Sequence, residues 1–215
     1  MELDLDFLSA RVASRGVQLD RDALGAAEPA AWVYYDGLVD AGHGHADAWR
    51  ALMARLLGDA GAADAPSLAA WLWTENPRAN LWRRPIVGMV SLAQELAGRG
   101  ATVAVISNSE GRLAELFAEI GLAGSFAAII DSGRIGLEKP DRRIFEHALA
   151  VVGAPAGTRA IHLGDSWDAD IAGARGAGWR AIWYGRRARP VDDPDIASAR
   201  DPAEARAALV RWGLL

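Results

Sequence analysis

The sequence predicts an α/β protein with a mostly parallel sheet, preceded by a helical segment. Three observations carry this prediction. Residues 7–82 show apolar spacing typical of helices and no strand pattern. After Pro85, short apolar runs alternate with helical segments. Strands that alternate with helices of this length are joined by right-handed crossovers, which makes the sheet parallel. We therefore expect two domains, a helical one at 7–82 and an α/β core at 85–215.

The front part contains four segments in which apolar residues recur at helical spacing. Glycine-rich or proline-rich breaks separate them. Gly16 is the expected C-terminal cap of the first helix, and the second helix is expected to begin near Asp20 or Arg21. Residues 42–45 interrupt the pattern before the third helix. The residues that mark the four segments are, in order, Phe7, Leu8, Arg11 and Val12; Trp32 and Leu38; Ala48, Leu52, Leu56 and Leu57; and Leu68, Trp71 and Leu72.

The elements of the core follow from the same rules. Strands are expected over 102–106, 127–131, 159–163 and 180–184, where short apolar runs end at turn residues. Helices are expected over 87–96, 113–120, 144–152, 168–177 and 202–212, and glycines follow most of them. Asp201 precedes Pro202 and is the expected N-cap of the last helix.

Composition and charge limit the classes of function. The chain has 215 residues, of which 51% are apolar, so it can bury a sizeable core. The net charge of −5 and the pI near 5.4 argue against a nucleic-acid partner. The sequence has no cysteine, which excludes disulfides and thiolate metal sites. It has neither a long uncharged apolar run nor a basic start, so we expect a cytoplasmic protein with no signal peptide and no membrane partner.

A hydroxyl group stands at the end of the first core strand. Ser107 follows the apolar run 102–106, and Asn108 and Ser109 precede the next helix. A side-chain donor and free backbone N–H groups at a helix start suit a phosphate oxygen. Ser107 and Asn108 are therefore candidate phosphate ligands. The alternative is that Asn108 or Ser109 only caps the helix.

Lys139 is the next candidate. It precedes Pro140, which favours an extended backbone, and it is the only lysine in an arginine-rich chain. A compact ammonium group held at this position would neutralise phosphate charge. The alternative is a solvated surface lysine.

Two carboxylates follow the third core strand. Gly164 permits a sharp turn, and Asp165 is then expected to face the crevice at the carboxyl ends of the strands. Asp170 lies on the helix that follows. Because Mg²⁺ prefers one or two carboxylates with water and phosphate oxygens, Asp165 and Asp170 are the candidate Mg²⁺ ligands. Asp168 is expected to cap the helix.

Together these motifs resemble those of the haloacid dehalogenase-like (HAD) hydrolase superfamily. The resemblance is close over residues 85–185, and the front half is similar to the family's C1-type helical cap. The matching residues are 103–108 (Val-Ala-Val-Ile-Ser-Asn), 137–141 (Leu-Glu-Lys-Pro-Asp) with Ile144 and Phe145, 162–166 (His-Leu-Gly-Asp-Ser) with Asp170, and 174–179 (Ala-Arg-Gly-Ala-Gly-Trp).

The resemblance implies a Rossmann-like core with a helical cap. It also implies a Mg²⁺-dependent hydrolase that acts on a small phosphomonoester through a phospho-aspartate. Ser107 and Lys139 would be the catalytic residues, with Ser107 holding a phosphoryl oxygen and Lys139 steadying the nucleophile and the phosphate. Asp165 would bind Mg²⁺. Phosphatases of the family carry Gly-Asp where Asp165 lies, whereas its dehalogenases lack the metal and carry other polar residues, so Asp165 favours phosphoester chemistry.

The family's nucleophile motif is missing from the expected elements. In the family, an Asp-x-Asp motif ends a central strand, which here would lie between the strands over 102–106 and 159–163. Asp4 and Asp6 have this spacing, but only three residues precede them and a helical pattern begins at Phe7, so we expect them to cap the first helix. We expect that Met1 is an internal methionine of a longer natural chain. A truncated chain and a degenerate homologue that binds without catalysis are the alternatives.

Other conspicuous residues have structural explanations. Tryptophans and tyrosines in the front half are expected to form its core. A hydrophobic wall for an organic leaving group, or a homodimer patch, is the alternative. His43 and His45 are expected in a surface loop and His162 inside a strand. The arginines within 186–189 are expected in a solvated loop.

Three functions remain open on the sequence. The main hypothesis is a Mg²⁺-dependent phosphomonoester hydrolase with a small phosphorylated substrate. The second is a non-catalytic HAD-like binding protein with a retained phosphate pocket, and the third is a metal-free haloacid dehalogenase.

Overall fold

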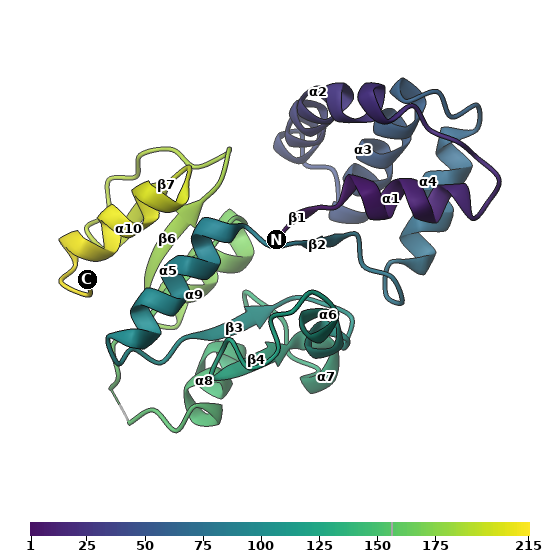
Figure 1. Ribbon diagram of the computed structural model, residues 1–215. Helices are drawn as coiled ribbons and strands as arrows, with labels where there is room; N and C mark the ends of the chain where they lie inside the picture. Colours follow the sequence, from purple (N-terminus) through teal and green to yellow (C-terminus); the bar gives the residue numbers. More distant parts are fainter. Residues whose placement is uncertain (156) are drawn as a thin grey trace. The chain divides into compact units, whose positions relative to one another are not determined.

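The computed structural model describes residues 1–155 and 157–215. The chain forms two compact units, Met1–Arg84 and Pro85–Leu215 (Figure 1). We refer to them as unit 1 and unit 2.

Unit 1 contains the four expected helices and one short strand pair that the sequence did not predict. The helices are α1 (Leu5–Ala13), α2 (Arg21–Asp40), α3 (His45–Asp59) and α4 (Ala65–Glu75). The strands β1 (Glu2–Leu3) and β2 (Trp82–Arg84) pair in antiparallel fashion. Strands of two and three residues are too short to produce a periodic pattern, so the expectation of a purely helical segment up to residue 82 was wrong at its end.

Aspartates begin three of these helices. The Asp4 carboxylate accepts a hydrogen bond from the Phe7 backbone N–H at 2.9 Å and caps α1. Asp20 and Asp64 cap α2 and α4 in the same way. Each bond satisfies a backbone donor that has no partner within the helix. The prediction that Asp4 is a helix cap is confirmed.

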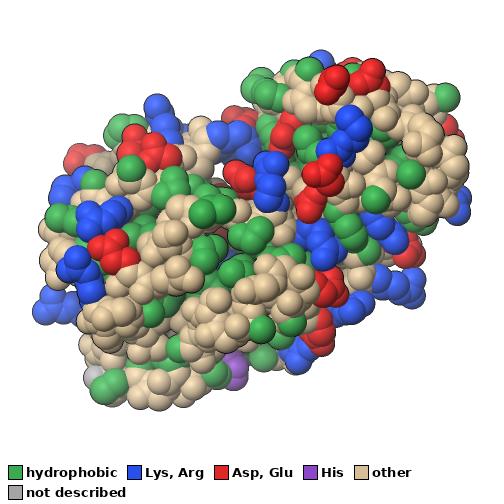
Figure 2. Space-filling view, in the orientation of Figure 1, with side chains coloured by type: hydrophobic (Ala, Val, Ile, Leu, Met, Phe, Trp, Pro, Cys, Tyr) green, Lys and Arg blue, Asp and Glu red, His purple; other side chains and the backbone are tan. Residues whose placement is uncertain are grey.

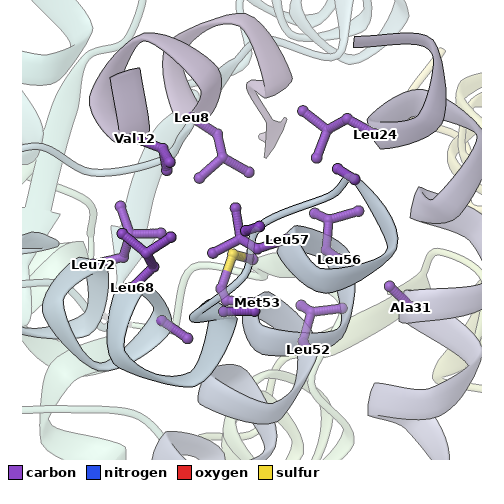
Figure 3. Close-up of a cluster of buried hydrophobic side chains, with 14 of the residues drawn as sticks. Leu8, Val12, Leu24, Ala31, Leu52, Met53, Leu56, Leu57, Leu68 and Leu72 are labelled. Atoms are coloured by element: carbon purple, nitrogen blue, oxygen red, sulfur yellow. The ribbon is translucent and has the colours of Figure 1, made fainter. Parts of the chain in front are cut away.

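Leucines from all four helices of unit 1 meet in one buried cluster. Figure 3 shows Leu8 and Val12 of α1 pointing toward the side chains of α3. The cluster continues through Leu24 and Ala31 of α2 and Leu68 and Leu72 of α4 (Figure 3). Trp49 is fully buried, and most of the other aromatic rings of unit 1 pack against the same cluster. The expected aromatic contribution to this core is confirmed.

Unit 2 alternates strands and helices. Its elements are α5 (Val87–Gly98), β3 (Ala104–Ser107), α6 (Leu113–Glu119), β4 (Ala128–Asp131), α7 (Ser132–Ile135), α8 (Arg142–Val151), β5 (Ile161–Gly164), the π-helix η1 (Trp167–Ala172), α9 (Gly173–Gly176), β6 (Arg180–Tyr184), β7 (Ile196–Ala199) and α10 (Pro202–Arg211). All strands and helices expected in this unit are present, with Asp201 as the N-cap of α10. The one helix expected over 168–177 is divided into η1 and α9. α7 was not predicted because it is a single turn, and β7 was not predicted because its sequence, Ile-Ala-Ser-Ala, contains only one large apolar residue.

The strands of unit 2 form two separate parallel sheets. β3 pairs with β4 (Figure 1). In the second sheet, β6 lies between β5 and β7. Within the described residues, no strand joins the free edge of β3 to the free edge of β5. The parallel α/β core is as predicted, but its sheet is interrupted between these two strands.

Alternation along β6 explains how the layers pack. Ala181 and Trp183 face a cluster with Phe145 of α8 and Ile171 of η1. Ile182, one position between them, faces α5 and α10. Since side chains of a strand point to opposite faces in turn, helices cover both faces of this sheet. Ala104 and Ile106 of β3 join the α8 cluster, so one apolar core supports both sheets.

Acidic and basic side chains are interspersed over the face drawn in Figure 2. Several form exposed ion pairs, such as Arg206 with Glu95 at 2.8 Å. In the part of the chain that the structure describes, none of the helices has both the length and the apolar character needed to cross a bilayer.

Candidate functional site

Carboxyl ends of parallel strands bring the predicted site residues to one edge of unit 2. Ser107 is the last residue of β3, and it lies in register with Asp131, the last residue of β4. The Ser107 side chain is partly exposed.

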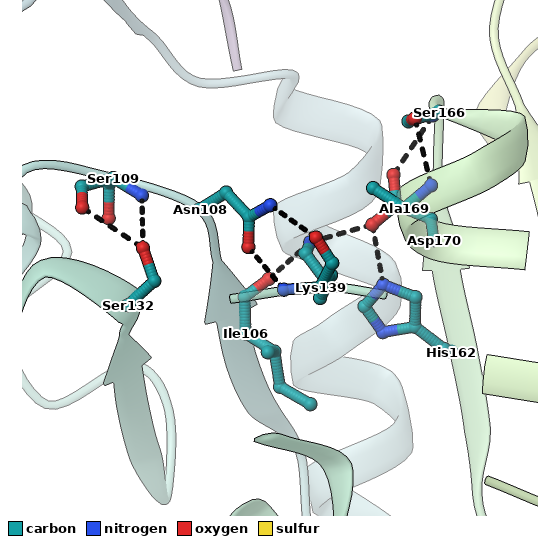
Figure 4. A network of polar contacts seen from close by, with 9 residues as sticks. All are labelled: Ile106, Asn108, Ser109, Ser132, Lys139, His162, Ser166, Ala169 and Asp170. Atoms are coloured by element: carbon teal, nitrogen blue, oxygen red, sulfur yellow. Dashed lines mark hydrogen bonds and ion pairs between the residues drawn. The ribbon is translucent and has the colours of Figure 1, made fainter. Parts of the chain in front are cut away.

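Asn108 holds Lys139 rather than a helix end. Its side-chain Nδ2 donates to the Lys139 carbonyl at 2.9 Å, and its Oδ1 accepts from the Lys139 backbone N–H at 2.8 Å (Figure 4). This pair of bonds fixes two loops that lie far apart in the sequence. The alternative of a helix cap is wrong for Asn108 and Ser109, because α6 begins only at Leu113 and has Arg112 at its N-cap position. The Lys139–Pro140 peptide bond is cis.

The Lys139 ammonium group is buried and has two partners. Nζ donates to the Ile106 carbonyl at 2.9 Å and to Asp170 Oδ1 at 2.6 Å (Figure 4). An ammonium group has three N–H donors, so one remains after these two bonds. Lys139 is only 9% exposed, which excludes the solvated surface lysine considered as the alternative.

Asp170 is the centre of this network (Figure 4). Its Oδ1 accepts from Lys139 and lies 2.9 Å from His162 Nε2, and its Oδ2 accepts from the Ser166 backbone N–H at 2.9 Å. Burial favours the neutral acid, but the hydrogen bond with His162 and the positive charge of Lys139 outweigh it and hold the pKa of Asp170 well below its ordinary value. The carboxylate therefore stays ionised.

His162 reaches Asp170 from inside β5, where the sequence predicted a histidine within a strand. The ring is buried and contacts Phe145 edge-on, with ring centroids 5.4 Å apart. Gly164 leaves room for the same carboxylate. A Cβ built on Gly164 would overlap the Asp170 carboxyl group and lie 2.5 Å from its Cβ. Glycine is thus required at position 164 because the Asp170 carboxyl group lies too close for a Cβ, in addition to the turn that the sequence suggested.

Asp131 organises the loop after β3, a role that was not predicted from the sequence. Its carboxylate, which is 2% exposed, accepts hydrogen bonds from Ser109 Oγ and from the backbone N–H groups of Gly111, Leu113 and Gly133. These bonds join the loop that carries Ser107 to the turn after β4. Only the position of Asp131 at a strand end could have signalled this, because three of the four donors are backbone groups.

Asp165 differs sharply from Asp170. Its side chain is exposed and, within the described residues, makes no hydrogen bond or ion pair, while its carbonyl accepts from Trp183 Nε1 at 3.2 Å. Ser166, and not the expected Asp168, caps the following helix by accepting from the Ala169 N–H. That part of the prediction was wrong, because the N-cap lies two residues nearer β5 than the pattern suggested.

Asp165 is the carboxylate of this edge that is free to take a hard cation. Its carboxylate oxygens are ligands of the kind that Mg²⁺ prefers. Both oxygens of Asp170, in contrast, already have hydrogen-bond partners in Lys139, His162 and the Ser166 N–H. Among the residues the structure describes, no group of three or more His, Asp or Glu side chains is arranged to hold a metal ion. The donor set fits a cation held by one carboxylate together with water and a phosphate group.

The chain is similar to known proteins over most of its length. A family model described as haloacid dehalogenase-like hydrolase matches residues 10–178. A curated relative, the phosphoserine phosphatase of Thermus thermophilus, is 39% identical over 106 residues. That match covers 47% of this chain and 42% of the relative, so the chain spans less than half the length of that protein.

Solved structures share the fold across both units. A putative HAD-hydrolase YfnB from Bacillus subtilis, described as bound to magnesium, matches with a TM-score of 0.63 at 20% identity and covers 96% of this chain and 93% of that one. A 2-haloacid dehalogenase from Pseudomonas syringae matches with a TM-score of 0.51 at 26% identity, covering 97% and 88%. The matched motifs, the parallel core and the family model agree, and the chain belongs to the haloacid dehalogenase-like hydrolase family.

Proposed function

We propose that the protein is a phosphohydrolase of small phosphomonoesters, with Ser107 and Lys139 as its phosphate-handling residues. One observation carries the proposal. Lys139 is a buried ammonium group with one N–H left over, fixed at the strand edge where Ser107 ends β3. A buried ammonium group is costly unless its charge is paired and its N–H groups are hydrogen-bonded, and a phosphoryl oxygen would be a suitable acceptor for the remaining N–H.

The charges of the network support a phosphate ligand. The Lys139 ammonium group neutralises the Asp170 carboxylate, so the negative charge of Asp170 does not oppose an incoming anion. In this proposal the Ser107 hydroxyl and the remaining Lys139 N–H donate to phosphoryl oxygens. Asn108 acts on the phosphate through Lys139, because its side chain is bonded to the lysine backbone.

The interrupted sheet indicates where the nucleophile would come from. We propose that an additional strand, ending in an aspartate, pairs with the free edges of β3 and β5. In the reaction, a carboxylate oxygen of that aspartate would attack phosphorus while the ester oxygen leaves with the electron pair. Water would then hydrolyse the phospho-aspartate to inorganic phosphate. Unpaired backbone groups on two neighbouring edges favour such a strand.

Mg²⁺ is part of the proposal through Asp165. This exposed carboxylate is free to take a cation. Asp170, in contrast, is bonded to Lys139 and would bind the metal only after releasing that lysine. When bound, Mg²⁺ supplies positive charge that offsets the phosphate. Its binding can be measured without turnover, by competition of Mg²⁺ with Mn²⁺ in paramagnetic NMR, with Asp165→Asn losing the site and Asp168→Asn keeping it.

Unit 1 is proposed to act as the cap that selects the substrate. The phosphatase name of the Thermus relative supports a small phosphorylated compound. The homodimer and the cytoplasmic location remain predictions, which light scattering and cellular fractionation would test.

Phosphate binding and turnover test the proposal separately. Inorganic phosphate should bind the native chain, and Ser107→Ala or Lys139→Met should abolish binding. Arg143→Met, which removes an exposed cation paired with Asp141, is the matched control and should bind normally. A chain extended by a strand that ends in Asp should hydrolyse an aryl phosphate with Mg²⁺. Absence of phosphate binding in the native chain would refute the proposal.

Two other functions have their own supporting observations. The interrupted sheet favours a non-catalytic binding protein, which would bind phosphate but show no turnover in the extended form as well. The likeness to the Pseudomonas dehalogenase favours haloacid chemistry, which would release halide without Mg²⁺. Asp165 argues against the latter, since a metal-free site has no need of an exposed carboxylate beside the anion.

A further inference from the structure

Trp167 is an exposed tryptophan at the edge that carries the candidate site. It is 40% exposed, and no other tryptophan in the described part of the chain appears among the exposed large apolar residues. It is the first residue of η1 and follows Asp165 by two positions. Tryptophan has a large, flat apolar surface, and the exposed part of this indole is available to a ligand at the same edge.

The Trp167 ring packs against a second tryptophan ring, that of Trp183. Its centroid lies 4.8 Å from that of Trp183, with an interplanar angle of 58°. Trp183 is itself buried and pairs with Gly164 across the parallel strands. Its Nε1 donates to the Asp165 carbonyl. The exposed ring, the buried ring and the backbone of the candidate metal ligand therefore form one connected unit.

A cation completes the support. The Arg189 guanidinium lies 4.9 Å from the Trp183 ring, in the geometry of a cation–π contact. The Arg189 carbonyl accepts a hydrogen bond from Ser198 Oγ, which ties the loop to β7. Trp183 is thus held by Asp165 and Arg189, and it gives the Trp167 ring a fixed surface to pack on. A fixed aromatic surface loses little conformational entropy when it stacks against a ligand.

We propose that Trp167 is a leaving-group subsite that stacks against the planar aromatic part of a phosphomonoester. This deepens the proposed function and rests on it, because the phosphate end of the ligand must lie at Ser107 and Lys139. The ligand class is aryl or nucleobase-bearing monophosphates rather than alkyl phosphates. An aromatic face stacks on an indole with little dependence on its hydrogen-bonding groups, so the subsite selects shape and not one particular ring.

Binding of three probes to the native chain tests the proposal by calorimetry. The probes are inorganic phosphate, methyl phosphate and phenyl phosphate. Phenyl phosphate should bind about 5-fold or more tighter than methyl phosphate, since stacking of a base on an aromatic side chain contributes this much or more. Trp167→Leu keeps an apolar side chain without the ring and should bring the ratio close to one. Trp167→Phe keeps a ring and should retain most of the preference.

Val151→Ala is the matched control. Val151 is 52% exposed on α8, and it is the last residue of a helix that leads to the amino end of β5, so it lies toward the opposite edge of the sheet. Its replacement should leave the phenyl-to-methyl ratio unchanged.

The outcomes separate the two proposals. If inorganic phosphate binds but phenyl phosphate binds no tighter than methyl phosphate, the subsite is refuted while the phosphohydrolase proposal stands. The subsite is likewise refuted if Trp167→Leu keeps the native ratio. If no probe binds, the phosphate site is refuted, and the subsite that depends on it is refuted too.

Discussion

Replacing Asp170 by asparagine removes the charge at the centre of the buried network while keeping its shape. In the native protein, Oδ1 accepts from Lys139 and lies beside His162, and Oδ2 accepts from the Ser166 N–H. An amide has only one acceptor oxygen. In either orientation its NH₂ group therefore faces a donor, which is Lys139 in one case and the Ser166 N–H in the other.

The expected loss of stability follows from the burial of both partners. Lys139 is 9% and Asp170 4% exposed, so water cannot replace the lost carboxylate. Removing one partner of a buried ion pair costs about 3–5 kcal/mol. Asp168→Asn is the matched control, since Asp168 lies exposed on the same helix. It should change the free energy of unfolding by less than about 0.5 kcal/mol.

The pH dependence has a defined sign. The folded-state pKa of Asp170 lies below its ordinary value. A carboxyl group of this kind stabilises the folded state fully above its unfolded-state pKa of about 3.9, and this contribution is lost as the pH falls through the lower folded-state pKa. The difference between the native protein and Asp170→Asn should therefore be constant above about pH 5 and shrink below about pH 4.

Urea unfolding followed by tryptophan fluorescence measures these differences. Trp179 and Trp183 pack in the same apolar cluster as Phe145 and report on unit 2. The measurement should be made with a chelator present, so that no cation contributes. A loss below about 1 kcal/mol at neutral pH, or a difference that stays constant down to about pH 3, would show that Asp170 and Lys139 are not coupled as described.

Three further predictions use other parts of the chain. Gly164→Ala should cost about 1–3 kcal/mol in urea unfolding because its Cβ overlaps Asp170, whereas Gly176→Ala, with open space around it, should be neutral or stabilising by up to about 1 kcal/mol; equal effects would contradict the close approach. Asp131→Ala should strip hydrogen-exchange protection from the Gly111 and Leu113 amides and cost about 3 kcal/mol or more, because one buried and two partly buried N–H groups lose their acceptor; unchanged protection would rule out its role in holding the loop. Asp4→Ala should lower stability by about 0.5–2 kcal/mol and Asp4→Asn by much less, with phosphate hydrolysis by an active form unaffected in both; loss of turnover in Asp4→Asn would make Asp4 the nucleophile instead of a cap.

Local signals in the sequence were enough for most elements and for the edge where the site residues meet. Apolar spacing and glycine punctuation located the helices, and Asp4 and Asp201 identified two helix starts because capping depends on neighbours three residues away. The strand ends at Ser107 and Gly164 followed from short apolar runs before turn residues. β1 and β2 were not predicted because two or three residues are too few to show a period, and β7 was not predicted because it has only one large apolar residue.

Long-range contacts could not be predicted in the same way. The sequence offered Asn108 as a phosphate ligand, while its side chain is bonded to Lys139, which lies 31 residues further on. It offered Asp170 as a metal ligand, and this role stays a prediction for a carboxylate that already holds Lys139 and His162. Asp131 collects four donors from two loops, an arrangement that depends on which strands are neighbours and leaves no local pattern.

The burial of Lys139 has a practical consequence, because it is the only lysine in the sequence. Amine-directed reagents have a single side-chain target in this protein, and most of the surface of that target is buried in unit 2. Reductive methylation with ¹³C-formaldehyde would place one side-chain label in the molecule, at the nitrogen that bridges β3 and Asp170. The rate of that labelling would read out opening of the core, and the chemical shift of the label would follow whatever anion arrives beside it.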